Sequence, residues 1–250
     1  MTFGSLAFVS GILGARGSGS RRLMTTMAAK KIRVDVTSDN ICPWCYVGKR
    51  SLEKAVASMG DEVDVTIRWH PFYLNPGWPK EGEVYSAKEH LAEKYGPGTF
   101  GRMTERLDSV AKDYELGINW GYDEEKSIVF NTAQSHMLVA AASEDGYAVQ
   151  NRLISLLFKS YFEENMNLDS QETLEAIAKE AKVSEGSIKA WKNGNFEDAV
   201  KRRTMQNYAR GIHGVPHFDI WAENSSSPIE LSGGQPPEAF QSVFKSLVSS

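Results

Sequence analysis

Residues 32–36 and 63–69 alternate between apolar and polar side chains, with the apolar members at every second position. A period of two is typical of a β-strand that buries one face. Residues 43–59 lie between them, contain no long β-branched run and stop at Gly60, which predicts a helix. A strand, a helix and a strand in this order form a crossover connection, and such connections join parallel strands. The segment therefore predicts two parallel, neighbouring strands.

From residue 84 to residue 210, helical spacing replaces this alternation. Apolar residues recur at intervals of three and four, which places them on one face of each helix. The apolar stripes and the glycine stops predict helices around residues 107–114, 133–141, 153–161, 174–181, 184–194 and 196–211. Asp169 and Glu172 resemble a capping box ahead of the fourth of these helices. We expect the helices to pack against one another as one helical unit.

The last forty residues return to the first pattern. Residues 218–221 and 229–231 are short strand candidates separated by a polar turn, and Pro236 and Pro237 then open a final helix with an apolar face. The order of elements indicates an α/β protein whose strands are interrupted by helices. The pattern divides the chain into a leading segment, a β-α-β half, a helical insertion and a β-β-α half, at residues 1–30, 31–80, 81–210 and 211–250.

The composition narrows the class of protein. The 250 residues are 41% hydrophobic and 24% charged, as in a folded globular protein. No run approaches the roughly 18 apolar residues that a membrane-spanning helix needs, so we expect no membrane partner. The formal net charge of −4 argues against nucleic acid as a partner bound through its backbone charge. The sequence leaves open whether the chain forms a homodimer.

The leading segment differs in charge from the rest of the chain. Residues 1–34 carry six bases and no acid, together with several serines and glycines. This composition is typical of an organelle transit peptide, and a disordered tail is the alternative for residues 1–30. A transit peptide predicts a location in the mitochondrion or plastid, whereas a tail predicts the cytoplasm.

The two cysteines of the chain, Cys42 and Cys45, are three residues apart at the start of the first predicted helix. Partial positive charge at a helix start stabilises a thiolate at Cys42, and the thiolate is the form that attacks disulfides. Cys45, one turn along the helix, is placed to resolve the resulting mixed disulfide. Zinc is disfavoured because four ligands are needed and no further cysteine exists, so we expect no metal. A structural disulfide across one turn constrains little of the chain, so a redox pair is favoured.

Pro216 precedes the third predicted strand. X-Pro bonds are the ones commonly found cis, and a proline beside a cysteine pair can offer a backbone edge to a substrate chain. Spacing alone, however, favours an ordinary proline at a strand entry. His136, on an apolar helix face, is expected to be a hydrogen-bonded core histidine, and His217 is expected nearer the cysteines.

Several segments together resemble one known family. They are residues 38–48 around the cysteine pair, 68–76, 131–136, 214–216 and 231–236, and they occur in the family's order. The chain resembles the DsbA-like thioredoxin-domain family, in its FrnE branch, over residues 31–248. The resemblance implies a thioredoxin fold split by a helical insertion, with Cys42 attacking, Cys45 resolving and Pro216 in cis. Pro43, Trp44 and His217 are then expected near the substrate.

The same superfamily contains the hydroxychromene-carboxylate isomerases and the kappa-class glutathione transferases, which keep a serine where Cys42 stands. By that resemblance Val215, Ser232 and Gly233 line a site for glutathione or for a substrate backbone. Two functions follow. The favoured one is a thiol–disulfide oxidoreductase for protein or small-molecule disulfides, without a tightly bound cofactor and with glutathione as a candidate co-substrate. The alternative is a glutathione-dependent isomerase or transferase, which has no use for Cys45.

Overall fold

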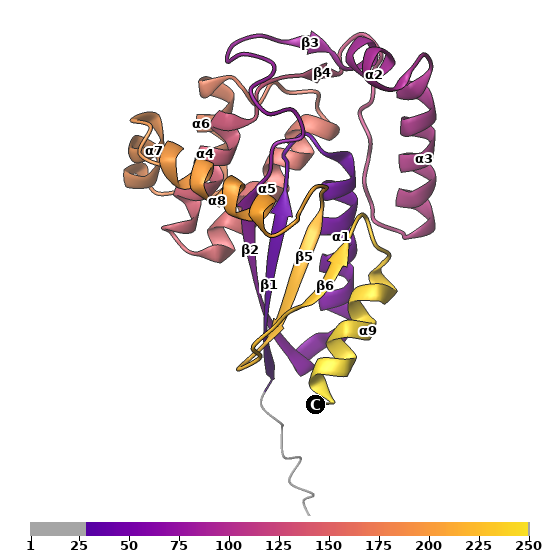
Figure 1. The fold of residues 1–250 in the computed structure, drawn as a ribbon, viewed down its shortest axis with the longest axis vertical. Helices are drawn as coiled ribbons and strands as arrows, with labels where there is room; N and C mark the ends of the chain where they lie inside the picture. Colours follow the sequence, from indigo (N-terminus) through magenta and orange to yellow (C-terminus); the bar gives the residue numbers. More distant parts are fainter. Residues whose placement is uncertain (1–28, 250) are drawn as a thin grey trace, which may run out of the picture.

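The computed structural model describes residues 29–249, and a four-stranded mixed sheet lies at its centre (Figure 1). The strand order is β2-β1-β5-β6, formed by β1 (Lys30–Ser38), β2 (Val63–Pro71), β5 (His217–Ala222) and β6 (Ile229–Ser232). β1 and β2 run parallel, as predicted, while β5 is antiparallel to β1 and β6 is antiparallel to β5. The prediction of a transit peptide or tail falls almost entirely on residues outside the described range.

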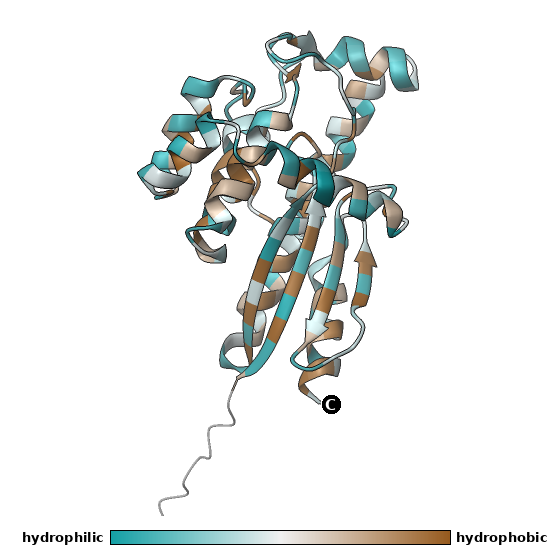
Figure 2. Ribbon diagram, turned by 60° about the vertical axis from the view of Figure 1, so that its left-hand side comes forward, coloured by the Kyte–Doolittle hydropathy of each residue, from teal (hydrophilic) through white to brown (hydrophobic). Residues whose placement is uncertain are grey.

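Two helices cover one face of this sheet (Figure 1). α1 (Pro43–Met59) makes the predicted crossover from β1 to β2 and ends at Gly60, after which η1 (Gly60–Glu62) leads into β2. α9 (Pro237–Val248) packs beside α1. Apolar strand residues alternate toward these helices, and hydropathy alternates along the strands in Figure 2. Phe218 and Phe240 meet edge to face there, with ring centroids 4.9 Å apart.

The helices between β2 and β5 form two groups, not the single unit that the pattern predicted (Figure 1). One group packs around α4 and comprises α4 (Ala133–Ser143), α5 (Tyr147–Phe162), α6 (Gln171–Glu180), α7 (Glu185–Lys192) and α8 (Glu197–Ala209). The other is the pair α2 (Ala87–Tyr95) and α3 (Thr99–Asp113), which contacts α1. Two-residue strands, β3 (Tyr85–Ser86) and β4 (Ile128–Val129), pair beside α2 and are too short for alternation to reveal.

The capping prediction at Asp169 is wrong by one residue. Ser170 caps α6, because its hydroxyl accepts a hydrogen bond from the Thr173 N–H at 3.3 Å. The carboxylate of Asp169 instead accepts from the Gly82 N–H at 2.6 Å. Asp169 is thus used to hold the loop after β2, a long-range contact that local spacing cannot indicate.

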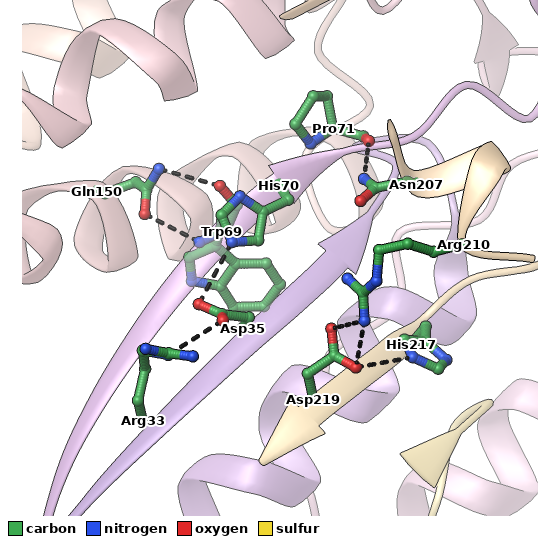
Figure 3. A network of polar contacts seen from close by, with 10 residues as sticks. All are labelled: Arg33, Asp35, Trp69, His70, Pro71, Gln150, Asn207, Arg210, His217 and Asp219. Carbon is green, nitrogen blue, oxygen red and sulfur yellow. Dashed lines mark hydrogen bonds and ion pairs between the residues drawn. The ribbon is translucent and has the colours of Figure 1, made fainter. Parts of the chain in front are cut away.

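Polar side chains close the outer edge and the second face of the sheet (Figure 3). The amide of Gln150 on α5 accepts from the Trp69 N–H at 2.9 Å and donates to the Trp69 carbonyl at 3.2 Å, so it pairs with the edge strand as another strand would. On the face toward α8, Arg210 donates twice to Asp219, at 2.8 Å each. Burial acts to raise the pKa of Asp219, but the hydrogen bonds and charges of His217 and Arg210 outweigh it and hold the pKa below its ordinary value.

Gly48 lets α1 approach the strand that follows the insertion. A Cβ at this position would lie 2.8 Å from the Phe218 ring and 3.0 Å from Pro216 Cγ. Both distances are shorter than ordinary van der Waals contact, so the absence of a side chain sets how closely α1 approaches Pro216.

We expect Gly48→Ala to lower the free energy of unfolding by about 1–3 kcal/mol, because the added methyl group overpacks the contact with Phe218 and Pro216. Gly101→Ala is the matched control, since Gly101 also lies in a helix but a Cβ there meets nothing within 4 Å. The control is expected to gain roughly 0.5–1 kcal/mol from helix propensity. Urea titration of both variants measures the difference, and a Gly48→Ala protein as stable as the control would contradict this account.

Candidate functional site

Cys42 occupies the N-cap of α1, with extended backbone dihedrals of φ −88° and ψ 111°. No side chain caps this helix end, Pro43 fills its first position, and its first turn holds no acidic residue. The helix dipole therefore favours negative charge at this end of the helix. The Cys42 side chain lies at this end of the helix.

Cys45 lies one turn further along α1 and is fully buried, whereas Cys42 is 4% exposed. Both thiols are free in this structure. Burial raises the pKa of Cys45 well above its ordinary value, and the hydrogen bond and charge of Cys42 raise it further. The hydroxyl of Ser38 and the backbone at Asp39 act in the opposite direction but are outweighed. Cys45 therefore stays protonated at neutral pH.

A buried carboxylate fixes the loop that leads into Cys42. Asp39 is fully buried, and its side chain accepts a hydrogen bond from the Leu74 N–H at 2.7 Å. The His136 ring lies 3.4 Å from the same carboxylate and 3.0 Å from the Phe72 carbonyl, which confirms His136 as a hydrogen-bonded core histidine. The main-chain oxygen of Asp39 accepts the Cys42 N–H at 3.1 Å. The buried Asp39 therefore fixes the position of Cys42 through hydrogen bonds of its side chain and main chain.

The loop before β5 meets the cysteine pair from the other side. The Val215–Pro216 peptide bond is cis, and the Val215 carbonyl accepts a hydrogen bond from the Cys42 thiol at 3.6 Å. The N–H of Gly233 donates to the Pro216 carbonyl at 2.8 Å, so the end of β6 holds this loop. Cys42, Val215 and Pro216 are therefore brought together from parts of the chain 173 residues apart.

Ser232 and His217 face each other on β6 and β5. The His217 ring lies 2.9 Å from the Ser232 hydroxyl. It lies 3.2 Å from the Asp219 carboxylate (Figure 3). His217 is not among the described residues that line the cavity beside Cys42. Ligand atoms of His217, Asp219 and Glu230 lie within 4.8 Å of one another, and Arg210 forms an ion pair with Asp219.

A cavity of about 400 Å³ opens beside Cys42, between the loop before α1 and the pair α2 and α3. Pro43, Trp44 and Val215 line it together with Cys42. The Trp44 ring lies over Gly234, where a Cβ would come within 2.7 Å of it, and the Arg106 guanidinium is 5.3 Å from the ring centroid. Trp44 is therefore held as one wall of the cavity.

Two tyrosines that line this cavity, Tyr122 and Tyr161, were not predicted from the sequence as site residues. Tyr161 belongs to a helical stripe that predicts only packing, and Tyr122 lies in an irregular segment without any periodic signal. The Tyr161 hydroxyl donates to the Ile128 carbonyl at 2.6 Å. The Tyr122 hydroxyl is buried and has no hydrogen-bond partner among the described residues.

Comparison with protein families identifies the chain. The family model for the DSBA-like thioredoxin domain matches residues 33–245, so the chain belongs to the DsbA-like thioredoxin-domain family, whose members act on thiol or disulfide substrates. The thioredoxin fold with a helical insertion is therefore confirmed. The chain is also 23% identical over 225 residues to the uncharacterized protein YwbO of Bacillus subtilis, covering 87% of this chain and 96% of that one.

Solved structures share this fold. A probable DsbA oxidoreductase from Streptomyces coelicolor has a TM-score of 0.75 at 24% identity, covering 88% of this chain and 91% of its own. A 2-hydroxychromene-2-carboxylate isomerase has a TM-score of 0.63 at 16% identity, covering 86% and 95% of the two chains. The fold is thus common to redox enzymes and to an isomerase. Among the described residues, no helix is long and apolar enough to cross a membrane.

The contrast between the two thiols predicts selective alkylation. In the reduced, folded protein at pH 7 to 8, iodoacetamide is expected to modify Cys42 and leave Cys45 intact, because a thiol with a raised pKa and no exposed surface supplies almost no thiolate. Peptide mass mapping reads the sites, and the urea-unfolded chain, in which both react, is the control. Equal labelling of both cysteines in the folded protein would contradict the assignment.

Proposed function

We propose that the protein is a thiol–disulfide oxidoreductase that uses Cys42 and Cys45 as a dithiol–disulfide pair. The observation that carries this proposal is the unequal placement of the two thiols. Cys42 lies at an uncapped helix start against a cavity, and Cys45 is buried one turn behind it with a raised pKa. An attacking thiol needs access and charge stabilisation, whereas a resolving thiol must stay protonated until it is needed.

In the first step, the Cys42 thiolate attacks one sulfur of the substrate disulfide. A bond forms between Cys42 and that sulfur, the substrate S–S bond breaks, and its electron pair leaves on the second sulfur as a thiolate. Val215 precedes β5, so its main chain lies outside the strand pairing of the sheet beside Cys42. We assign to this edge the backbone of an extended substrate, with Pro216 keeping it next to the sulfur.

In the second step, Cys45 loses its proton and attacks the Cys42 sulfur. The Cys42–Cys45 disulfide forms, and the remaining substrate sulfur leaves as a thiol, so two electrons have passed from the protein to the substrate. A low-molecular-weight thiol of the glutathione class is the proposed reductant that restores the dithiol. Val215, Gly233 and Ser232 are the proposed residues around it, and no tightly bound cofactor is needed.

A glutathione-dependent isomerase or transferase is the second candidate. The cavity next to Cys42 favours it, because its walls suit an apolar co-substrate. Cys45 weighs against it, since a thiol behind Cys42 would expel glutathione from any covalent adduct.

Cys42→Ser is expected to reduce insulin disulfides no faster than the uncatalysed background, because serine cannot form the mixed disulfide. Cys45→Ser is the matched variant, one turn away with the same change of atom. It keeps the first attack and loses resolution, so it is expected to accumulate mixed disulfides with glutathione or substrate that are visible by intact mass. Circular dichroism of both variants controls for folding.

If Cys42→Ser reduces insulin at the wild-type rate, the proposed function is wrong. The second candidate would be favoured by two results together. Cys45→Ser would show efficient isomerase or transferase activity with glutathione, and the wild type would reduce no disulfide.

A further inference from the structure

The cavity beside Cys42 has a lining suited to an apolar group. Apolar side chains make up most of its wall, and Ile41, Leu91, Phe100, Met103, Val129 and Phe162 are among them. Its described lining contains no carboxylate, and Lys94, at the α2 side, donates to Asn75 at 2.9 Å. A volume of about 400 Å³ lies in the range of small-molecule sites and is too small for a folded protein.

The hydroxyls of Tyr122 and Tyr161, which both line this cavity, differ in their hydrogen bonding. The Tyr122 hydroxyl is buried and unpaired among the described residues, while the Tyr161 hydroxyl in the same wall is used by the Ile128 carbonyl. Buried hydroxyls are nearly always paired, so an unpaired one beside a reactive thiol indicates a ligand that completes it. The Tyr122 ring is held in place, stacked on Trp120 at 5.0 Å and edge-on to Phe100 at 6.1 Å.

The electrostatics agree with a role as donor. Burial raises the pKa of Tyr122 well above its ordinary value, and negative charge at Tyr161 and at Cys42 raises it further. Tyr122 therefore keeps its proton and responds to charge on the Cys42 sulfur. Tyr122 and Cys42 line the same cavity, and no hydrogen bond joins their side chains.

We infer that Tyr122 is a catalytic residue that donates a hydrogen bond to the departing sulfur of a small, apolar disulfide held in this cavity. The inference rests on the proposed oxidoreductase function and names its substrate class, a disulfide between aryl or branched alkyl thiols. As the bond from Cys42 forms, the substrate S–S bond breaks and its electron pair moves to the departing sulfur. The Tyr122 hydroxyl stabilises that charge without transferring its proton, and the thiolate leaves.

The test is a single-turnover reaction of the reduced full-length protein with a series of para-substituted diaryl disulfides, following release of the aryl thiolate by absorbance. Tyr122→Phe removes one unpaired hydroxyl and keeps the ring, so the fold loses no hydrogen bond. The rate with diaryl disulfides is expected to fall by about 10-fold to 100-fold, the range for a hydrogen bond to a charged group. The loss is expected to be greatest for the least acidic aryl thiol, because its thiolate most needs stabilisation.

Tyr208→Phe is the matched control, since the Tyr208 hydroxyl donates to the Tyr73 carbonyl at 3.1 Å and Tyr208 does not line the cavity. It is expected to react at the wild-type rate. Insulin is too large to enter a cavity of about 400 Å³, so its reduction is expected to slow less in Tyr122→Phe than the reaction with diaryl disulfides does. In Tyr122→Phe, Cys42 is expected to be alkylated at the wild-type rate.

Each result decides between the two proposals. Equal rates and equal dependence on the aryl thiol in Tyr122→Phe and wild type overturn the inference and leave the oxidoreductase in place. A loss that is uniform across the series and extends to insulin also overturns it, because the tyrosine is then structural. A wild-type protein that forms no Cys42–Cys45 disulfide with any substrate removes the proposed function itself. If Tyr122→Phe fails to fold, 3-fluorotyrosine at position 122 makes the hydroxyl a stronger donor, and an unchanged rate there overturns the inference.

Discussion

The close packing of α1 against the loop that carries Pro216 is the contact on which the site depends. Gly48 permits it, because any larger residue would collide with Phe218 and Pro216. It brings the Cys42 thiol within 3.6 Å of the Val215 carbonyl, although the two residues come from opposite halves of a split fold.

The surroundings of Cys42, of the loop before it and of Cys45 differ in polarity. The helix start at Cys42 is left uncapped and free of acids, and the buried Asp39 lies behind the loop with its oxygens occupied by Leu74 and His136. These contacts of Asp39 anchor the loop that leads into α1. Cys45 lies in the dry interior, where burial keeps it a thiol. One turn of helix separates two identical side chains into different chemical environments.

The sequence predicted those features that depend on local pattern. The β-α-β unit, the helix that begins after Cys42 and the closing β-β-α half follow from periods of two and three to four residues. The family resemblance supplied what spacing could not, because spacing alone treated Pro216 as an ordinary strand-entry proline, and its peptide bond is cis.

Contacts between segments far apart in the chain could not be predicted from the sequence. The insertion splits into two groups because α3 packs on α1 and not on α4, and the apolar stripe of α3 does not indicate its partner. Ser170 replaces Asp169 as the cap because Asp169 is engaged by Gly82, 87 residues away. The sequence could not indicate Tyr122 for the same reason. Only the folded chain shows that its hydroxyl is buried without a partner among the described residues, and that Tyr122 lines the same cavity as Cys42.

The most direct measurement of the central claim is the intact mass and tryptophan fluorescence of the purified protein across a series of reduced to oxidised glutathione ratios. Trp44 lies between the two cysteines and reports on their state. The account predicts one two-electron transition in which the protein loses two hydrogens, because Cys45 expels glutathione from Cys42 and closes the internal disulfide. A persistent glutathione adduct on Cys42, with no internal disulfide at any ratio, would contradict it.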